Sequence, residues 1–397
     1  MRLRNKENKE TGTGNRRWLV AAAGVAVAAA AAIPAASASA SQVSQSPVTG
    51  HVYLDDNTAG ANTIAGFDRH ADGTLTPTPG SPFAVGGAGT GAGLASQGAV
   101  QLADGGRFLL AADAGSNQIS VLGVGPGGAL RDVSVVSSGG TTPVSIAVHG
   151  SLVYVANAGT GGSNYTGFRL SPFGSLTPLP GSTIPLPDSA QPGDVLFNAT
   201  GTNLIGTEVN SSLIDSFTVR PNGTLKAAPG SPFKAQGVGP FGSEFRPTSP
   251  TQLFVTNAHN GTGLGTVSAF ADSASGELAS IGASPYADQQ TAPCWLVITP
   301  DGRYLFAVNT GSGFISSYSI SRGGALTLLG STQVSASGGV GAVDPGVSPD
   351  GRYLYVNETK VGAVGTFAIG ANGSLSEVSG SPAALPAGAT AAGIAVS

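Results

Sequence analysis

Four residues of this sequence have types and spacing that suit chemistry on a small molecule. Asp194 and Asp344 fall at the same position of a repeating unit, three units apart, and Ser145 and Trp295 hold that position in two other units. A pair of carboxyl groups performs acid–base work when burial moves their pKa values apart. An indole offers a stacking surface for a sugar ring. We therefore take Asp194, Asp344 and Ser145 as candidate catalytic residues, and Trp295 with the two aspartates as candidate ligand-binding residues.

The repeating unit that positions these residues is clearest between residues 293 and 320. The run PCWLVIT is closed by the turn PDG, RYLFAVN follows, and the turn TGSG leads into ISSYSI, so three strands are predicted. A Gly-x-Leu element then starts one more short strand. Its glycines recur as Gly73, Gly128, Gly174, Gly223, Gly276, Gly324 and Gly373. Four short strands in each of seven units predict an all-β fold, a seven-bladed β-propeller.

A second repeated feature is the residue that ends the RYLFAVN strand. It is Asp, Asn or Glu in every unit, and such side chains hydrogen-bond to the backbone of a following turn. The seven positions are Asp56, Asp113, Asn157, Glu208, Asn257, Asn309 and Glu358. We assign them a structural role in these turns and set aside the alternative of a calcium site around residues 55–57.

The two ends of the repeat region complement each other. The first unit begins with HVYL at residue 51 and lacks the strand that precedes PDG elsewhere, whereas the chain finishes with AAGIAVS, which reads as such a strand and nothing more. We therefore expect the propeller to span residues 51–397, with the C-terminal strand completing the first blade. This closure removes the open edge that a circle of sheets otherwise leaves.

The N-terminal residues 1–40 are predicted to be a signal peptide that lies outside the fold. A basic segment ends in Arg16-Arg17, an Ala-rich apolar run continues to about residue 33, and small residues at 36–40 offer cleavage sites. The paired arginines resemble a twin-arginine signal. The apolar run is short and weak beside the ~20 residues that a membrane span needs. We expect a secreted protein, retained at the cell wall or released, with residues 41–50 as a linker and no transmembrane anchor after cleavage.

The charge balance argues against nucleic acid and anionic membranes as partners. Removing residues 1–40 takes six of the 18 Lys+Arg and two of the 22 Asp+Glu, which leaves 12 against 20 and a net charge of −8. Both of those partners require a concentrated basic patch, and no basic run follows Arg17. A single cysteine, Cys294, rules out an intrachain disulfide.

Several blade-forming motifs carry a family resemblance. PDGRYLFAVN at residues 300–309, PDGRYLYVNE at 349–358 and the recurring GxLTPxPGSP ends resemble the lactonase family of seven-bladed propellers, which includes 6-phosphogluconolactonase-type and carboxymuconate-cyclase-type enzymes. YVAN at residues 154–157 is similar to the YVTN repeats of surface propellers. The resemblance covers almost all of residues 50–397. It implies a propeller fold and, as an activity, hydrolysis of a lactone, that is, of a carboxylic ester.

The same resemblance implies a catalytic set of Arg and His that this chain lacks. The family's GPRH segment corresponds here to residues 239–242, where Phe241 takes the Arg position and Gly242 the His position. The later Pro-Arg pair of the family is replaced in the stretch 343–346, VDPG. A phosphorylated or carboxylated lactone would meet Asp194 and Asp344 instead of a cation, which is electrostatically unfavourable.

Aligning the inner strands places one residue of each blade at the height of that missing His, near the mouth of the channel. The ring reads Ala99, Ser145, Asp194, Gly242, Trp295, Asp344 and Gly393. It contains neither His nor Arg. We expect Asp194 and Asp344 to face each other across the channel, and the alternative that each caps a strand or faces channel water stays open.

Other chemistry-bearing residues have structural interpretations. The histidines His51, His70, His149 and His259 lie in or beside turns of different blades without metal-binding spacing, so no metal centre is expected. Cys294 lies in an apolar strand and is interpreted as a buried thiol. The Gly-rich run 86–98 lacks the GKS/T of a phosphate loop and is interpreted as a connection between blades. No cofactor is expected.

Two classes of function remain open from the sequence. One is a catalytically silent propeller, a monomer whose rigid face binds a glycan, a cell-wall component or a cell-surface protein. The other is a secreted lactonase that hydrolyses an uncharged sugar lactone at the channel mouth. The absence of the family's Arg/His set, together with the predicted export, favours the binding propeller. Two buried, adjacent carboxyl groups would instead favour the enzyme, because burial raises the pKa of an acid.

Overall fold

The computed structural model describes residues 46–334 and 340–397. The predicted signal peptide and the first half of the predicted linker, residues 41–45, lie outside the described residues. No helical segment of the described chain is long and apolar enough to cross a membrane.

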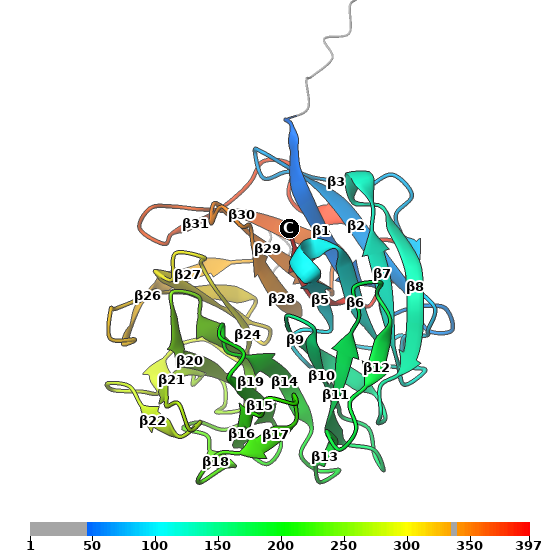
Figure 1. Ribbon diagram of the computed structural model, residues 1–397. Helices are drawn as coiled ribbons and strands as arrows, with labels where there is room; N and C mark the ends of the chain where they lie inside the picture. Colours follow the sequence, from blue (N-terminus) through cyan, green and yellow to red (C-terminus); the bar gives the residue numbers. More distant parts are fainter. Residues whose placement is uncertain (1–45, 335–339) are drawn as a thin grey trace, which may run out of the picture. The chain divides into compact units, whose positions relative to one another are not determined.

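Seven antiparallel sheets form the described part of the chain, and their first strands contact one another in a closed circle, β33–β5–β9–β14–β19–β24–β28 and back to β33 (Figure 1). The fold is therefore an all-β, seven-bladed propeller, as predicted. The first strands are the inner wall of a central channel. The chain runs outward through each blade before it enters the next.

The strands of blades 1 to 4 are given from the channel outward. Blade 1 consists of β33 (Ala392–Val396), β1 (Val48–Asp55), β2 (Thr63–His70) and β3 (Leu75–Pro77). Blade 2 consists of β5 (Val100–Ala103), β6 (Phe108–Asp113), β7 (Gln118–Val124) and β8 (Leu130–Ser137). Blade 3 consists of β9 (Pro143–His149), β10 (Leu152–Asn157), β11 (Asn164–Leu170) and β12 (Leu176–Pro178). Blade 4 consists of β14 (Pro192–Phe197), β15 (Asn203–Glu208), β16 (Leu213–Val219) and β17 (Leu225–Ala227).

The remaining blades follow the same order. Blade 5 consists of β19 (Pro240–Arg246), β20 (Ser249–Asn257), β21 (Thr266–Asp272) and β22 (Leu278–Ser280). Blade 6 consists of β24 (Pro293–Ile298), β25 (Tyr304–Asn309), β26 (Phe314–Ile320) and β27 (Leu326–Gln333). Blade 7 consists of β28 (Ala342–Val347), β29 (Tyr353–Glu358), β30 (Ala363–Ile369) and β31 (Leu375–Glu377).

Short elements complete the fold. Two-residue strands pair with the third strand of five blades: β4 (Phe83–Ala84), β13 (Ile184–Pro185), β18 (Phe233–Lys234), β23 (Tyr286–Ala287) and β32 (Ala383–Ala384). Blade 2 also contains two short 3-10 turns, η1 (Asp104–Gly106) and η2 (Pro126–Gly128).

The Gly-x-Leu glycines explain how neighbouring blades fit together. All seven have φ between +75° and +92°, a region that disfavours residues with a Cβ. A Cβ at Gly73 would also collide with the ring of Tyr353, on the preceding blade. The hydroxyl of Tyr154 donates a hydrogen bond to the carbonyl of Gly223, also from one blade to the next. The repeated glycine is thus a turn residue and a blade-to-blade contact at once.

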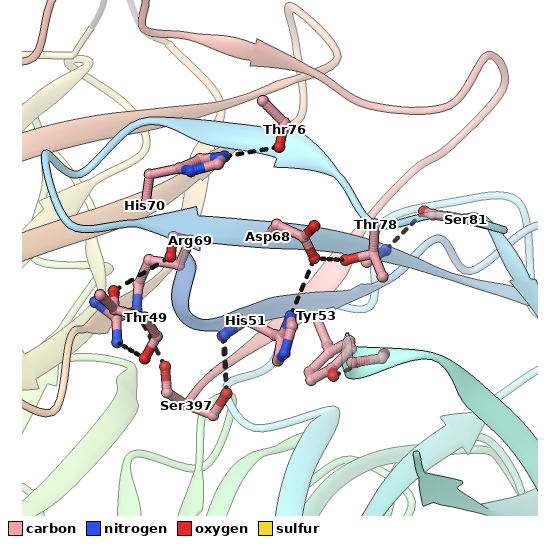
Figure 2. A network of polar contacts seen from close by, with 12 residues as sticks. Thr49, His51, Tyr53, Asp68, Arg69, His70, Thr76, Thr78, Ser81 and Ser397 are labelled. Carbon is pink, nitrogen blue, oxygen red and sulfur yellow. Dashed lines mark hydrogen bonds and ion pairs between the residues drawn. The ribbon is translucent and has the colours of Figure 1, made fainter. Parts of the chain in front are cut away.

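The ring is closed by β33, which pairs with β1 as predicted. The N–H of His51 donates to Ser397 Oγ at 3.0 Å, and the N–H of Ser397 donates to the His51 carbonyl at 2.8 Å. Arg69 Nε donates to the Ser397 carbonyl and Arg69 Nη2 to the Thr49 carbonyl, at 3.0 and 3.1 Å (Figure 2). Strand β1 begins at Val48, within the predicted linker.

One residue of the predicted strand-end series is shifted. Strand β1 ends at Asp55, which pairs with Ala392 as Asn157 pairs with Pro143, so Asp55 and not Asp56 belongs to the series. The prediction missed this because both residues are aspartates. The turn role agrees with the hydrogen bond from Asn157 Nδ2 to Asn164 Oδ1, across the turn that follows, at 2.9 Å.

Candidate functional site

Bulges at the starts of the inner strands set the register of the predicted ring. In blade 3 Pro143 pairs with Asn157, yet Ser145 pairs with Ala156, so one extra residue stands between them. The same shift occurs in blades 4 and 6, where Asp194 pairs with Thr207 and Trp295 with Val308. These pairs place the three predicted residues at one level. β-bulges often re-aim side chains next to functional sites.

The first blade departs from the predicted ring by one residue. Tyr53 pairs with Ala395 as Val155 pairs with Ile146, which puts Ile394 at the ring level in place of Gly393. The prediction failed here because β33 belongs to the end of the chain and carries its own bulge.

Asp194 connects three blades. Its Oδ1 accepts a hydrogen bond from Ser145 Oγ at 3.1 Å, and its Oδ2 accepts bonds from the N–H and Oγ of Ser243, at 2.9 and 2.8 Å. Ser145 Oγ in turn accepts a bond from the N–H of Val195 at 3.1 Å. The aspartate is 3% exposed, so these bonds satisfy a carboxyl group that is almost entirely buried.

Asp344 is held by the first blade and by the chain before β5. Its Oδ2 accepts a bond from the N–H of Gly393 at 2.9 Å, and its Oδ1 accepts a longer one from the N–H of Gly98 at 3.4 Å. A Cβ on Gly98 would lie 3.7 Å from Asp194 Oδ1, so the two carboxyl groups flank the same glycine. Asp344 is 2% exposed.

Trp295 is anchored rather than free. Its Nε1 donates to the Ser96 carbonyl at 2.7 Å, and its ring packs edge-on against Phe241 with ring centroids 5.0 Å apart. Phe241, which stands where the resemblance implies an Arg, therefore helps to fix the indole.

Two cavities lie on opposite sides of residues 93–98, and they divide the predicted site. The mouth cavity has a volume of about 420 Å³ and is lined by residues 93–96, Trp295, Val343, Asp344, Thr359, Lys360 and residues 390–392. The channel cavity, about 470 Å³, is lined by Gln97, Gly98, Asp194, Asp344 and the inner strands further along. Trp295 borders the mouth cavity, Asp194 borders the channel cavity and Asp344 borders both, whereas Ser145 borders neither.

Sequence reasoning missed Glu244, which also lines the channel cavity. Its Oε2 accepts a bond from the N–H of Ile298 at 2.8 Å. Glu244 pairs with Phe254, as Gln101 pairs with Leu110 in blade 2, so both polar residues stand two positions after the predicted ring. Extending the repeat alignment by those two positions would have found them.

Burial raises the pKa of all three channel carboxyl groups. The pKa of Asp194 rises to about 7 despite the bonds from Ser243 and Ser145, which lower it. The pKa of Asp344 also rises to about 7 through burial, against the bonds from the N–H groups of Gly393 and Gly98. The pKa of Glu244 reaches about 8, because burial is reinforced by the charge of Asp194. Burial therefore favours the neutral form of each carboxyl group, and none of them supplies a positive charge for an anion.

The comparisons with known proteins agree on the fold. The family described as lactonase, 7-bladed beta-propeller, matches residues 61–182 and 252–387. No curated protein matches the chain.

Solved structures of similar fold include a periplasmic gluconolactonase of Pseudomonas aeruginosa, with 16% identity and a TM-score of 0.68 over 87% of this chain and 98% of that one. A provisionally assigned 6-phosphogluconolactonase of Bacteroides fragilis has 19% identity and a TM-score of 0.67 over 88% and 98% of the two chains. One of Bacteroides uniformis has 20% identity and a TM-score of 0.68 over 88% and 99%. At these identities the structures show a common fold. Because the family match spans well over half of the sequence and the seven blades are complete, the chain belongs to the lactonase family of seven-bladed β-propellers.

Proposed function

We propose that this protein is an exported propeller that binds an uncharged ligand at its mouth cavity and that has lost the Arg/His chemistry implied by its family. The observation that carries the proposal is the state of Asp194 and Asp344. Each of their four oxygens accepts a hydrogen bond from within the protein. Carboxyl groups occupied in this way hold the ring of blades together and are poorly placed to attack a substrate.

The mouth cavity suits a neutral glycan or a similar small ligand. Its lining includes the apolar residues Trp295, Leu94 and Val343 together with the polar residues Thr359 and Thr390. Ligand sites of this kind combine an apolar surface with a few polar groups. Lys360 is the one basic side chain among the described residues that line the two cavities. A single exposed lysine does not compensate a phosphate as an arginine cluster does.

Fluorescence of the mature protein tests this function directly. The chain has two tryptophans, Trp18 and Trp295, so a protein comprising residues 41–397 reports from Trp295 alone. We expect neutral oligosaccharides to change its emission in a saturable way. Lys360→Ala should weaken binding, and Lys226→Ala, an exposed lysine on β17, is the matched control. Equal binding by the two variants, or no saturable change with any neutral glycan, would contradict a site at the mouth.

The second candidate is a lactonase for uncharged sugar lactones. The raised pKa values of Asp194 and Asp344 favour it, because a general acid or base works best when its pKa lies near the working pH. Turnover of gluconolactone that disappears in the Asp194→Asn/Asp344→Asn double variant, and persists in Asp132→Asn on β8, would establish this enzyme. We expect no turnover of 6-phosphogluconolactone in either case, because the single lysine at the mouth, Lys360, does not compensate its phosphate as an arginine cluster would.

Export is part of the same proposal. Residues 1–40 have the basic, apolar and small-residue segments of a signal peptide. Mass spectrometry of protein recovered from the culture medium should give an N-terminus near residue 41. If the signal is of the twin-arginine type, Arg16→Lys/Arg17→Lys should retain the precursor inside the cell. Recovery of intact residues 1–40 outside the cell would exclude cleavage.

A further inference from the structure

Residues 93–98, which the sequence presents as the end of a Gly-rich connection, cross the mouth of the channel. Residues 93–96 line the mouth cavity, and Gln97 and Gly98 line the channel cavity. One short segment therefore separates the two cavities. We call it the plug segment.

Five blades bind the plug segment through polar groups that face the channel. Blade 3 contributes the Val144 carbonyl, which accepts from Ser96 Oγ at 2.7 Å, and the Ile146 N–H, which donates to the Gly98 carbonyl at 2.9 Å. Blade 4 contributes the Gly193 carbonyl, which accepts from the Gln97 N–H at 2.8 Å. The other contacts come from Ser243, Trp295, Leu296 and Asp344.

Gln97 is the centre of this arrangement. Its Nε2 donates to the Ser243 carbonyl at 3.1 Å, and its Oε1 accepts from the N–H of Leu296 at 3.0 Å. Blades 5 and 6 thus present one acceptor and one donor that together match a carboxamide. A carboxylate would lack the donor, and an ammonium group would lack the acceptor.

We propose that the channel mouth contains a carboxamide-binding site and that the plug segment fills it as an intramolecular ligand through Gln97. Gly98 follows with φ +81°, and a Cβ there would lie 3.1 Å from Gln101 Nε2 and 3.2 Å from Ser145 Oγ. A residue other than glycine would not let the chain pass so close. While Gln97 occupies this site, molecules in the mouth cavity cannot reach Asp194 and Glu244, which line the channel cavity. This inference does not depend on the proposed ligand at the mouth.

The first test uses Trp295, whose indole bonds to the plug segment at Ser96. In the protein of residues 41–397, Gln97→Ala should shift Trp295 emission to longer wavelength and raise its acrylamide quenching constant several-fold. Gln101→Ala is the matched control, because Gln101 also lines the channel cavity and its amide has no hydrogen-bond partner among the described residues. Its emission and quenching should equal those of the wild type.

The second test asks whether the vacated position recognises a carboxamide. Propionamide reproduces the Gln97 side chain beyond Cα. It should raise the thermal midpoint of Gln97→Ala and restore its quenching in a saturable way, because a ligand that binds the folded state stabilises it. Propionate and 2-butanone, which have the same shape without the same donors and acceptors, should not. The wild type and Gln101→Ala should not respond to propionamide.

Two results would overturn the inference. One is a quenching constant in Gln97→Ala equal to that of the wild type, and the other is equal rescue by propionate, 2-butanone and propionamide. If Gln97→Ala fails to fold, Gln97→Met keeps the volume and removes both hydrogen bonds. Increased Trp295 quenching in a folded Gln97→Met protein would support the plug, and unchanged quenching would reject it.

Discussion

Asp194 shows how a residue chosen for its chemistry can serve the fold. It stands on blade 4 and accepts hydrogen bonds from Ser145 on blade 3 and Ser243 on blade 5. A buried carboxyl group is costly unless it is hydrogen-bonded, and the three donors here would in turn lack an acceptor without it. Asp194 therefore helps to hold blades 3, 4 and 5 together.

Replacing this residue should reveal that role. Asp194→Ala leaves the N–H and hydroxyl of Ser243 and the hydroxyl of Ser145 without their acceptor, so we expect a loss of about 2–4 kcal/mol in the free energy of unfolding. Urea unfolding followed by circular dichroism measures it. Asp132→Ala, at an exposed position of β8, should change the value by less than ~0.5 kcal/mol. Equal losses in the two variants would show that the Asp194 bonds are unimportant.

The sequence predicted the strand register of the site residues better than it predicted which other residues contact them. Aligning the repeats put Ser145, Asp194 and Trp295 at one register, because a strand fixes the height of its residues. It could not place Gln97, because that residue reaches the channel through a connection whose path depends on contacts with five blades. It also gave no sign that Ser243 would bind Asp194, since such a bond depends on the bulge and on the angle between blades.

Among the elements, the repeated Gly turns were predictable in full. A turn with positive φ is a local property of Gly-x-Leu, so the pattern marks all seven sites. Packing against the neighbouring blade is a tertiary property, and the sequence showed nothing of the contact between Gly73 and Tyr353.

Substitutions at two glycines, Gly127 and Gly73, separate the cost of the turn conformation from the cost of the contact between blades. Gly127 has φ +65° with no atom within 4 Å of an added Cβ, so Gly127→Ala should cost only the backbone strain, roughly 1–2 kcal/mol. Gly73→Ala adds a collision with Tyr353 and should cost clearly more. Unfolding free energies of both variants measure the difference. If the two variants lose the same amount, the blade contact adds nothing to the turn.

The closing strand β33 allows a prediction about the loss of a whole strand. Removing residues 392–397 exposes the edge of β1 and takes the acceptor from Arg69, so we expect loss of cooperative unfolding and a tendency to aggregate. A synthetic peptide of residues 389–397 should restore the thermal transition by strand addition. Size-exclusion chromatography and calorimetry follow both effects. A truncated monomer that melts like the full chain would contradict the role of β33.

The described part of the molecule buries acids in several blades as well as in the channel. Besides the channel carboxyl groups, burial raises the pKa of several aspartates in the blades to about 6 or 7: Asp56, Asp113, Asp215, Asp272 and Asp288. The folded protein therefore holds protons that the unfolded chain, with ordinary aspartate pKa values near 4, releases.

This difference fixes the direction of the pH dependence. Between pH 4 and pH 7 the folded state binds more protons than the unfolded state, so the free energy of unfolding falls as the pH rises. We expect a higher thermal midpoint at pH 5 than at pH 7.5. The Asp194→Asn/Asp344→Asn double variant should have a flatter profile over the same interval, because two of the groups no longer titrate. A midpoint that rises from pH 5 to pH 7.5 would contradict the raised pKa values.

The pairing of β33 with β1 also determines when the ring can close during synthesis of the chain. His51 and Ser397 bond to each other across 346 residues, so an interval of synthesis separates the two strands that they join. At ordinary rates of translation, that interval lasts roughly 20–70 s. Throughout this interval the inner edge of β1 in blade 1 stays unpaired, while blades 2 to 7 are synthesised. The circle can be completed only after β33 has been synthesised, so the growing chain is an open row of blades before it becomes a ring.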